Sequence, residues 1–65
     1  MKLNRKKLEL AMARACMNTE DLQKATQIPR PTITGAITGR GIRTATAGRI
    51  AKALGVDVTE ILEDE

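Results

Sequence analysis

Residues 18–41 read NTEDLQKATQIPRPTITGAITGRG, and this stretch decides the fold. It opens with Asn18, a residue type that caps helix N-termini well. Glu20 and Asp21 follow in the first turn, where acidic side chains interact favourably with the helix dipole. We therefore predict a helix over about 19–26, which must end before the Ile-Pro pair that follows, since proline disfavours helical backbone at the residue before it.

A second helix follows almost at once. Pro31 is tolerated in the first turn of a helix, and Gly39 and Gly41 are suited to ending one, so we predict this helix over about 31–38. Two short helices joined by a turn of three or four residues have the spacing of a helix-turn-helix unit.

The rest of the chain predicts further helices around this unit. We expect a helix over 3–16, another over 44–54 with Thr44 as its cap and Gly55 as its stop, and a last short helix capped by Asp57. Apolar residues recur at helical spacing throughout. We expect the core to include Leu8, Ala11 or Met12, Ala15, Leu22, Ala25, Ile28, Ile33, Ala36, Ile37, Ala47, Ile50, Ala51, Leu54, Ile61 and Leu62. The prediction is one compact all-α domain over residues 1–65.

The composition argues against several classes of function. The chain has no His, Phe, Tyr or Trp, and Cys16 is its only cysteine. A general base of the usual kind, a four-ligand zinc site and stacking platforms for single-stranded nucleic acid are therefore absent. We predict no catalytic residue, no metal site and no cofactor. Without a membrane-spanning stretch or an export signal, we expect a cytoplasmic protein, associated with the nucleoid when bound to DNA.

Charge is unevenly distributed along the chain. Residues 1–55 hold all 11 basic residues and three acidic ones, a balance of +8, whereas residues 56–65 hold five acidic residues and no basic one. A basic body suits a polyanion such as duplex DNA, although Lys and Arg could serve only to keep a small domain soluble. The acidic tail could solubilise its end of the molecule, repel DNA or mark the side on which a partner protein binds.

The stretch 18–41, together with AGRIAKALGVDVTEIL at 47–62, resembles the Cro/CI-type (XRE-like) helix-turn-helix family of phage and bacterial regulators. The resemblance implies a lambda-repressor-like domain of five helices. It also implies that the helix over 31–38, which is the third along the chain, enters the major groove of double-stranded DNA. Proteins of this family often bind as a homodimer on a two-fold symmetric site.

The resemblance assigns roles to individual positions. Residues in base-facing or groove-lining places are Arg30, Pro31, Thr32 and Gly35, and the exposed face of the same helix adds Thr34 and Thr38. Thr19 at the start of the preceding helix, and Arg40 and Arg43 in the loop after the third helix, match positions that contact phosphates. Lys6 belongs to a basic cluster at the first helix N-terminus, where an anionic partner would offset the unfavourable dipole. Solvated loop charges and neutral surface residues are the alternative interpretation.

This sequence departs from the family pattern at several positions. Gln23 replaces a small residue between the two helices, and Gln27 replaces a turn glycine, which suggests an altered turn because left-handed Gln costs roughly 1 kcal/mol. Met12 and Ile37 stand where some relatives place a buried Arg–Glu pair. The third helix lacks a long amide or charged side chain on its outer face, so we expect Arg30 to carry most hydrogen-bonded discrimination and DNA shape the rest.

The sequence therefore favours a sequence-specific transcriptional regulator, a repressor that acts by occupying its site. Two alternatives remain open. One is an antitoxin or other protein-interaction module on the same fold, which an exposed apolar patch around Ile61 and Leu62 would favour. The other is a nonspecific architectural DNA binder. The operator, the regulated gene and the oligomeric state do not follow from these residues.

Overall fold

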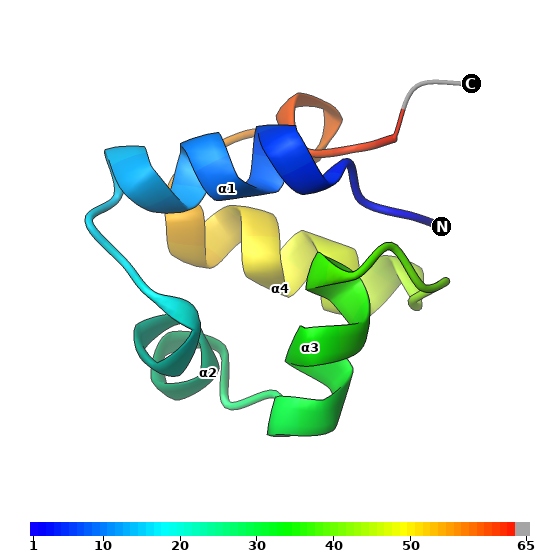
Figure 1. Cartoon of the computed structure of the whole chain (residues 1–65), viewed down its shortest axis with the longest axis horizontal. Coiled ribbons are helices and arrows are strands. Elements are labelled where there is room, and N and C mark those ends of the chain that lie inside the picture. The colour runs from blue at the N-terminus through cyan, green and yellow to red at the C-terminus, as the bar shows by residue number, and fades with distance from the viewer. Residues whose placement is uncertain (64–65) are drawn as a thin grey trace.

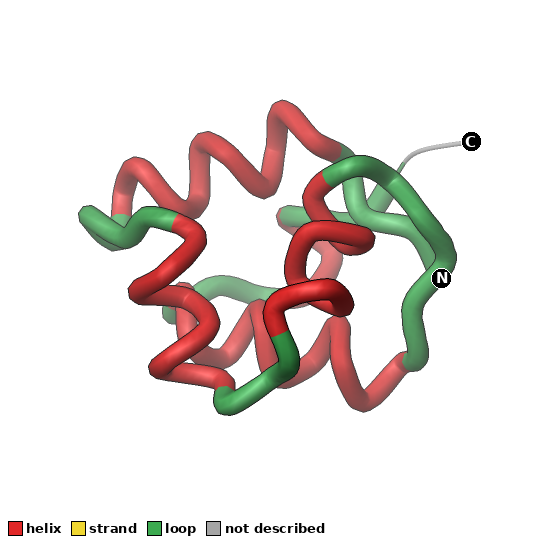
Figure 2. Tube along the Cα trace, turned by 60° about the horizontal axis from the view of Figure 1, so that its bottom comes forward, coloured by secondary structure: helices red, strands yellow, loops and turns green. Residues whose placement is uncertain are grey.

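The computed structural model describes residues 1–63, so Asp64 and Glu65, which end the predicted acidic tail, lie outside the described residues. Within the described part, four α-helices and one turn of 3-10 helix succeed one another (Figure 1), joined by short loops (Figure 2). They are α1 (Arg5–Arg14), α2 (Thr19–Thr26), α3 (Arg30–Ile37), α4 (Thr44–Leu54) and the 3-10 turn η1 (Val58–Glu60). The predicted all-α class is confirmed.

The expected fifth helix is shorter than predicted and consists of η1 alone. Its cap is nevertheless the predicted one, because Asp57 accepts from the amide of Thr59 (2.9 Å) and the Glu60 carboxylate accepts from the amide of Asp57 (3.3 Å). The hydrogen bonds from Thr59 hold the pKa of Asp57 below its ordinary value. The ionised Asp57 carboxylate therefore stabilises the fold fully at pH values above the ordinary pKa. This stabilisation is lost as the pH falls through the lowered pKa.

Backbone pairing explains why the chain does not stay helical after η1. The amide of Asn4 donates to the carbonyl of Ile61 (2.8 Å), and the amide of Glu63 donates to the carbonyl of Lys2 (3.0 Å). These bonds form an isolated antiparallel bridge centred on Leu3 and Leu62. The extended backbone at both ends of the described chain pairs amide and carbonyl groups that would otherwise bond within a fifth helix.

The same bridge shortens α1 at its start. Leu3 is extended rather than helical, and Asn4 caps the helix with its Oδ1, which accepts from the amide of Lys7 (2.9 Å). At the other end Cys16 is left-handed, with φ 55°, and its amide donates to the carbonyl of Ala13 (3.1 Å). The helix therefore spans Arg5–Arg14 instead of the expected 3–16.

The helices of the central unit follow the prediction more closely. α2 spans the predicted residues, and Asn18 forms a capping box with Asp21. One core assignment was wrong: Ala25 is exposed and Thr26 is buried, because Thr26 shares the inner face with Leu22 one turn earlier.

The start of α3 and the cap of α4 each differ from the prediction by one residue, whereas α4 spans the predicted residues. α3 begins at Arg30 rather than Pro31, with Pro29 as its N-cap. α4 begins at Thr44, which is its first helical residue and not its cap, and the N-cap Arg43 makes no side-chain capping bond.

A single apolar core fills the space between the helices. α2 packs against both α3 and α4, while α1 and α4 contact η1. The fully or nearly fully buried apolar residues are Leu3, Leu8, Ala11, Met12, Leu22, Ile28, Ile33, Ala36, Ala47, Ile50, Ala51, Leu54 and Ile61. Among the expected core residues, Ala15, Ile37 and Leu62 pack against this cluster but are only partly buried. Among residues 1–63, no helix has the length and hydropathy needed to cross a membrane.

Candidate nucleic-acid interface

The turn between α2 and α3 keeps a tight left-handed form despite its unusual residue. Gln27 has φ 56° and ψ 27°, and its amide donates to the carbonyl of Gln23 (2.8 Å). The altered turn suggested by Gln27 is therefore not seen. Gln27 itself adopts the left-handed backbone conformation, which costs roughly 1–2 kcal/mol for a residue with a side chain.

The buried hydroxyl of Thr26 holds this turn in place. It donates to the carbonyl of Leu22 (2.7 Å) and accepts from the amide of Ile28 (3.3 Å). It thus joins the end of α2 to the residue that carries the chain into α3. The sequence prediction missed Thr26, whose spacing of four residues from Leu22 was the available signal.

Six of the predicted contact residues are brought together beside α3. They line one shallow depression formed by Arg30, Pro31, Thr34, Gly35, Thr38 and Arg40. The Thr38 hydroxyl donates to the carbonyls of Thr34 (3.0 Å) and Gly35 (3.1 Å), so its proton is used within the helix. Toward a base edge it offers only a methyl group and acceptor capacity.

Gly35 leaves room for the stem of Arg40. A Cβ atom at position 35 would lie 3.6 Å from Cδ and 3.8 Å from Cβ of Arg40, which is ordinary van der Waals contact. Backbone bonds fix the Arg40 main chain: its amide donates to the carbonyl of Gly35 (2.9 Å), and the left-handed Gly39 donates to that of Ala36 (3.3 Å). This is a Schellman cap, and it places Arg40 beside the helix that it follows.

A second depression adjoins the first on the side of α4. Thr32 and Arg43, both predicted contacts, lie in it together with Gln27, Ile28, Pro29, Gly41, Ile42, Thr46 and Arg49. The sequence prediction missed Thr46 and Arg49. Their spacing of three and six residues from Arg43 places all three on one side of α4, and that periodicity was the signal that could have found them.

A third depression lies on the α2 side and shares residues with both others. It is lined by Glu20, Gln23, Lys24, Gln27, Ile28, Pro29 and Arg30. Arg30 also lines the depression beside α3, and Gln27 also lines the one beside α4. The three depressions therefore form a continuous surface around the start of α3.

Two predicted phosphate contacts do not line these three depressions. Lys6 is on the outer face of α1, in a separate depression with Glu9, Leu10 and Ala13. Thr19 is the first residue of α2 and is half-buried.

Arginine side chains border the continuous surface without acidic partners. Within residues 1–63, no ion pair involves Arg30, Arg40, Arg43 or Arg49, which we call the arginine rim. Two ion pairs in this part of the chain, Arg5–Glu9 and Lys24–Glu20, are exposed and lie within single helices. An unpaired guanidinium keeps all its donors for an anion such as phosphate.

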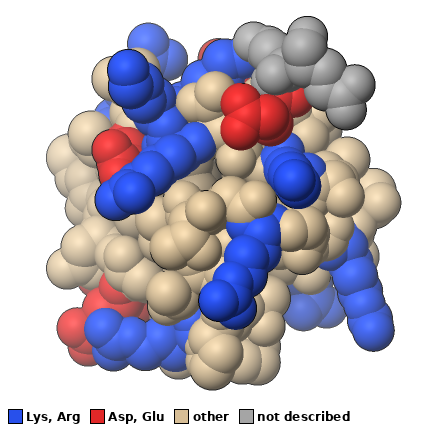
Figure 3. Space-filling model, turned by 45° about the vertical axis from the view of Figure 1, so that its right-hand side comes forward, with Lys and Arg blue, Asp and Glu red and all other residues tan. Residues whose placement is uncertain are grey.

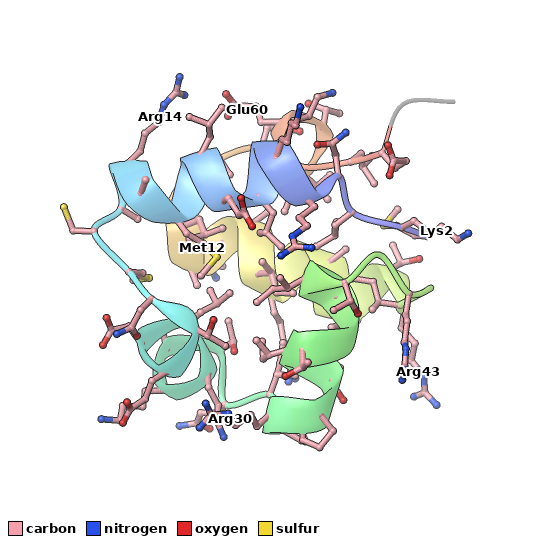
Figure 4. All side chains as sticks on the ribbon, viewed as in Figure 1. Lys2, Met12, Arg14, Arg30, Arg43 and Glu60 are labelled. Atoms are coloured by element: carbon pink, nitrogen blue, oxygen red, sulfur yellow. The ribbon has the colours of Figure 1, made fainter. Side chains whose placement is uncertain are left out.

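The figures show how the charged groups are distributed. Arg30 and Arg43 project from the lower part of the molecule, whereas Arg14 and Glu60 project from the opposite side (Figure 4). Several Lys and Arg side chains protrude from the face that includes the α3–α4 loop, and acidic groups occupy only small parts of it (Figure 3).

Comparison with known proteins identifies a family. Residues 7–65 match the family model described as a Cro/C1-type HTH DNA-binding domain. No curated protein and no solved structure matches the chain significantly. The family match includes α2, α3, α4, most of α1 and the continuous surface around α3, and the chain therefore belongs to the Cro/C1-type helix-turn-helix DNA-binding domain family.

Proposed function

We propose that this domain is a sequence-specific regulator of transcription, and that it represses by occupying its site on duplex DNA. In this proposal α3 enters the major groove, where Arg30 donates to a guanine edge and Pro31, Thr32, Thr34, Gly35 and Thr38 line the contact with bases. The observation that carries the proposal is the continuous surface around the start of α3, bordered by the unpaired arginine rim.

Phosphate contacts are assigned to residues on either side of α3. Arg40 and Arg43 reach the DNA backbone from the loop, Arg49 joins them from α4, and the Thr19 amide and hydroxyl serve the other strand. Lys6 lies on the outer face of α1, so it would reach only a backbone segment that wraps around that helix. These contacts position the domain and supply affinity that depends on salt.

A homodimer on a two-fold symmetric operator completes the proposal. Two copies of this small surface would contact half-sites about one helical turn apart, since a single α3 spans only a few base pairs. The measurement is a selection on random duplex DNA followed by sequencing. Enrichment of a motif with two-fold symmetry is the expected result, and its half-site spacing reports the geometry of the dimer.

Nonspecific architectural binding is a second candidate, favoured by the short side chains on α3. Pro31, Thr34, Gly35 and Thr38 offer few hydrogen bonds to bases, whereas the arginine rim binds phosphate irrespective of sequence. Tight binding at low salt without any enriched motif would select this candidate. Binding of a protein and no duplex DNA would instead select an antitoxin-like role, although Ile61 is fully buried and offers no patch for it.

A further inference from the structure

The N-terminal segment Met1–Asn4 lies between two parts of the chain that are distant in sequence. In Figure 1 it runs beside the α3–α4 loop on one side and the C-terminal segment on the other. The amide of Ile42 donates to the carbonyl of Met1 (2.7 Å), and the nitrogen of Met1 donates to the carbonyl of Ile42 (3.2 Å). The segment thus links the loop that bears Arg43 to the body of the domain.

The inner part of this segment is firmly held. Leu3 is fully buried, and Lys2 and Asn4 pair with the backbone of Glu63 and Ile61. The side-chain amide of Asn4 also donates to the Glu63 carboxylate (3.2 Å). These contacts of residues 2–4 therefore fix the position of Met1, whose carbonyl accepts from Ile42.

The two halves of the α3–α4 loop depend on different restraints. Arg40 is fixed by the Schellman cap of α3, whose bonds involve only Gly35 and Ala36. Arg43 is the N-cap of α4, where its carbonyl accepts from the amide of Ala47 (3.0 Å), but no side-chain capping bond holds this end of the loop. Between these points, the hydrogen bonds of Ile42 with Met1 are the backbone restraint on the loop within the described residues.

We propose that Met1–Asn4 is a positioning strap, which orders Ile42 and thereby holds Arg43 ready for a DNA phosphate. The proposal rests on the proposed function, since it concerns how the domain contacts duplex DNA. Ordering the loop before DNA arrives removes an entropic cost that the complex would otherwise carry. Arg40 does not need the strap, and it therefore serves as an internal reference.

The test compares two chains made by chemical synthesis, which a length of 65 residues allows. One lacks Met1, and the other carries Met1→Ala, which removes the same side chain but keeps the carbonyl that Ile42 contacts. Both keep Leu3 in the core. A third chain replaces the Ile42 amide with an ester and removes the donor alone, which keeps the test valid if removal of Met1 perturbs folding.

The readout is duplex affinity, measured on the selected site. Loss of Met1 should lower duplex affinity several-fold, by less than Arg43→Ala does, because the loop must then be ordered on binding. Loss of Met1 should have no further effect in an Arg43→Ala background and its full effect in an Arg40→Ala background. A purely structural role would lower the folded fraction and weaken binding equally in the Arg43→Ala and Arg40→Ala backgrounds.

Hydrogen exchange provides a readout that is independent of DNA. Loss of Met1 should accelerate exchange of the Ile42 amide while the Arg40 amide stays protected by its cap. If the chain without Met1 matches Met1→Ala in affinity, the strap has no role in binding and the proposal is wrong. If the unmodified chain binds no duplex DNA, the proposed function fails first, and the role of the strap in binding fails with it.

Discussion

The outer face of α3 and the arginine rim lie side by side but offer DNA very different chemistry. The α3 face presents Pro31, Thr34, Gly35 and Thr38, none of which has a long donor side chain. The rim presents four guanidinium groups with no acidic partner among residues 1–63. The difference indicates that affinity and discrimination come from separate sets of residues, with Arg30 shared between them because it belongs to the rim and opens α3.

Replacing Arg30 should have the largest effect, because Arg30 belongs to both sets and its loss would reduce affinity and discrimination together. For Arg30→Ala we expect a loss of discrimination of about 1–3 kcal/mol at one base-pair position of each half-site. The measurement is a competition assay with DNA substituted at each position in turn. Arg30→Lys is the control that retains the charge, and it should keep most affinity for phosphate but lose the bidentate contact. Full discrimination by Arg30→Ala would show that another group reads the sequence.

Removing charge from the rim should weaken binding to all sequences alike. For Arg43→Ala and Arg49→Ala we expect the plot of log K against log[salt] to become less steep by about 0.9 in each case, with the preferred motif unchanged. The matched control is Arg14→Ala, because Arg14 projects from the opposite side of the molecule (Figure 4). An equal loss in the Arg14 variant would mean that overall charge, and not the position of the rim, determines affinity.

Adding a methyl group at Gly35 tests how closely the α3 face approaches DNA. Gly35→Ala should stabilise the fold by up to about 1 kcal/mol, because alanine is the better helix former and the Arg40 stem leaves ordinary contact distance. We expect weaker DNA binding in spite of this gain. Gly48→Ala in α4, where a Cβ would meet nothing within 4 Å, should give the same stabilisation without the loss. Denaturant unfolding and DNA titration measure the two effects; undiminished affinity of Gly35→Ala would rule out a close approach.

The smallest effect is expected at the turn between α2 and α3. Gln27→Gly relieves a left-handed backbone but makes the unfolded chain more flexible, so we expect a net stabilisation of less than about 1 kcal/mol. Cys16→Gly, at the other left-handed non-glycine residue, should stabilise by a similar amount and leave DNA binding unchanged. Since the Gln27 side chain lines two depressions of the interface, only its variant should alter affinity. If Gln27→Gly and Cys16→Gly bind DNA with the same affinity, the Gln27 side chain has no role in DNA binding.

The limits of the sequence prediction lie in contacts between distant segments. The helix α2, the left-handed stop at Gly55 and the cap at Asp57 depend on neighbouring residues, and all three were predicted correctly. Ala25 was placed inside and Thr26 was overlooked, because helical spacing alone does not say which polar group finds a buried partner. The missed Arg49 shares one side of α4 with Arg43, but that side lines the interface only because α4 is docked beside the turn before α3.

The amino-acid sequence by itself determined the family, the order of the helices and the residues around the start of α3, because caps, prolines and apolar spacing act over a few residues. Only the tertiary structure decided that the last helix stops after one turn and that Met1–Asn4 lies between the α3–α4 loop and the C-terminal segment. Those backbone bonds join residues about forty to sixty positions apart, and no local preference specifies such partners. They form only once the packed core has brought the segments together.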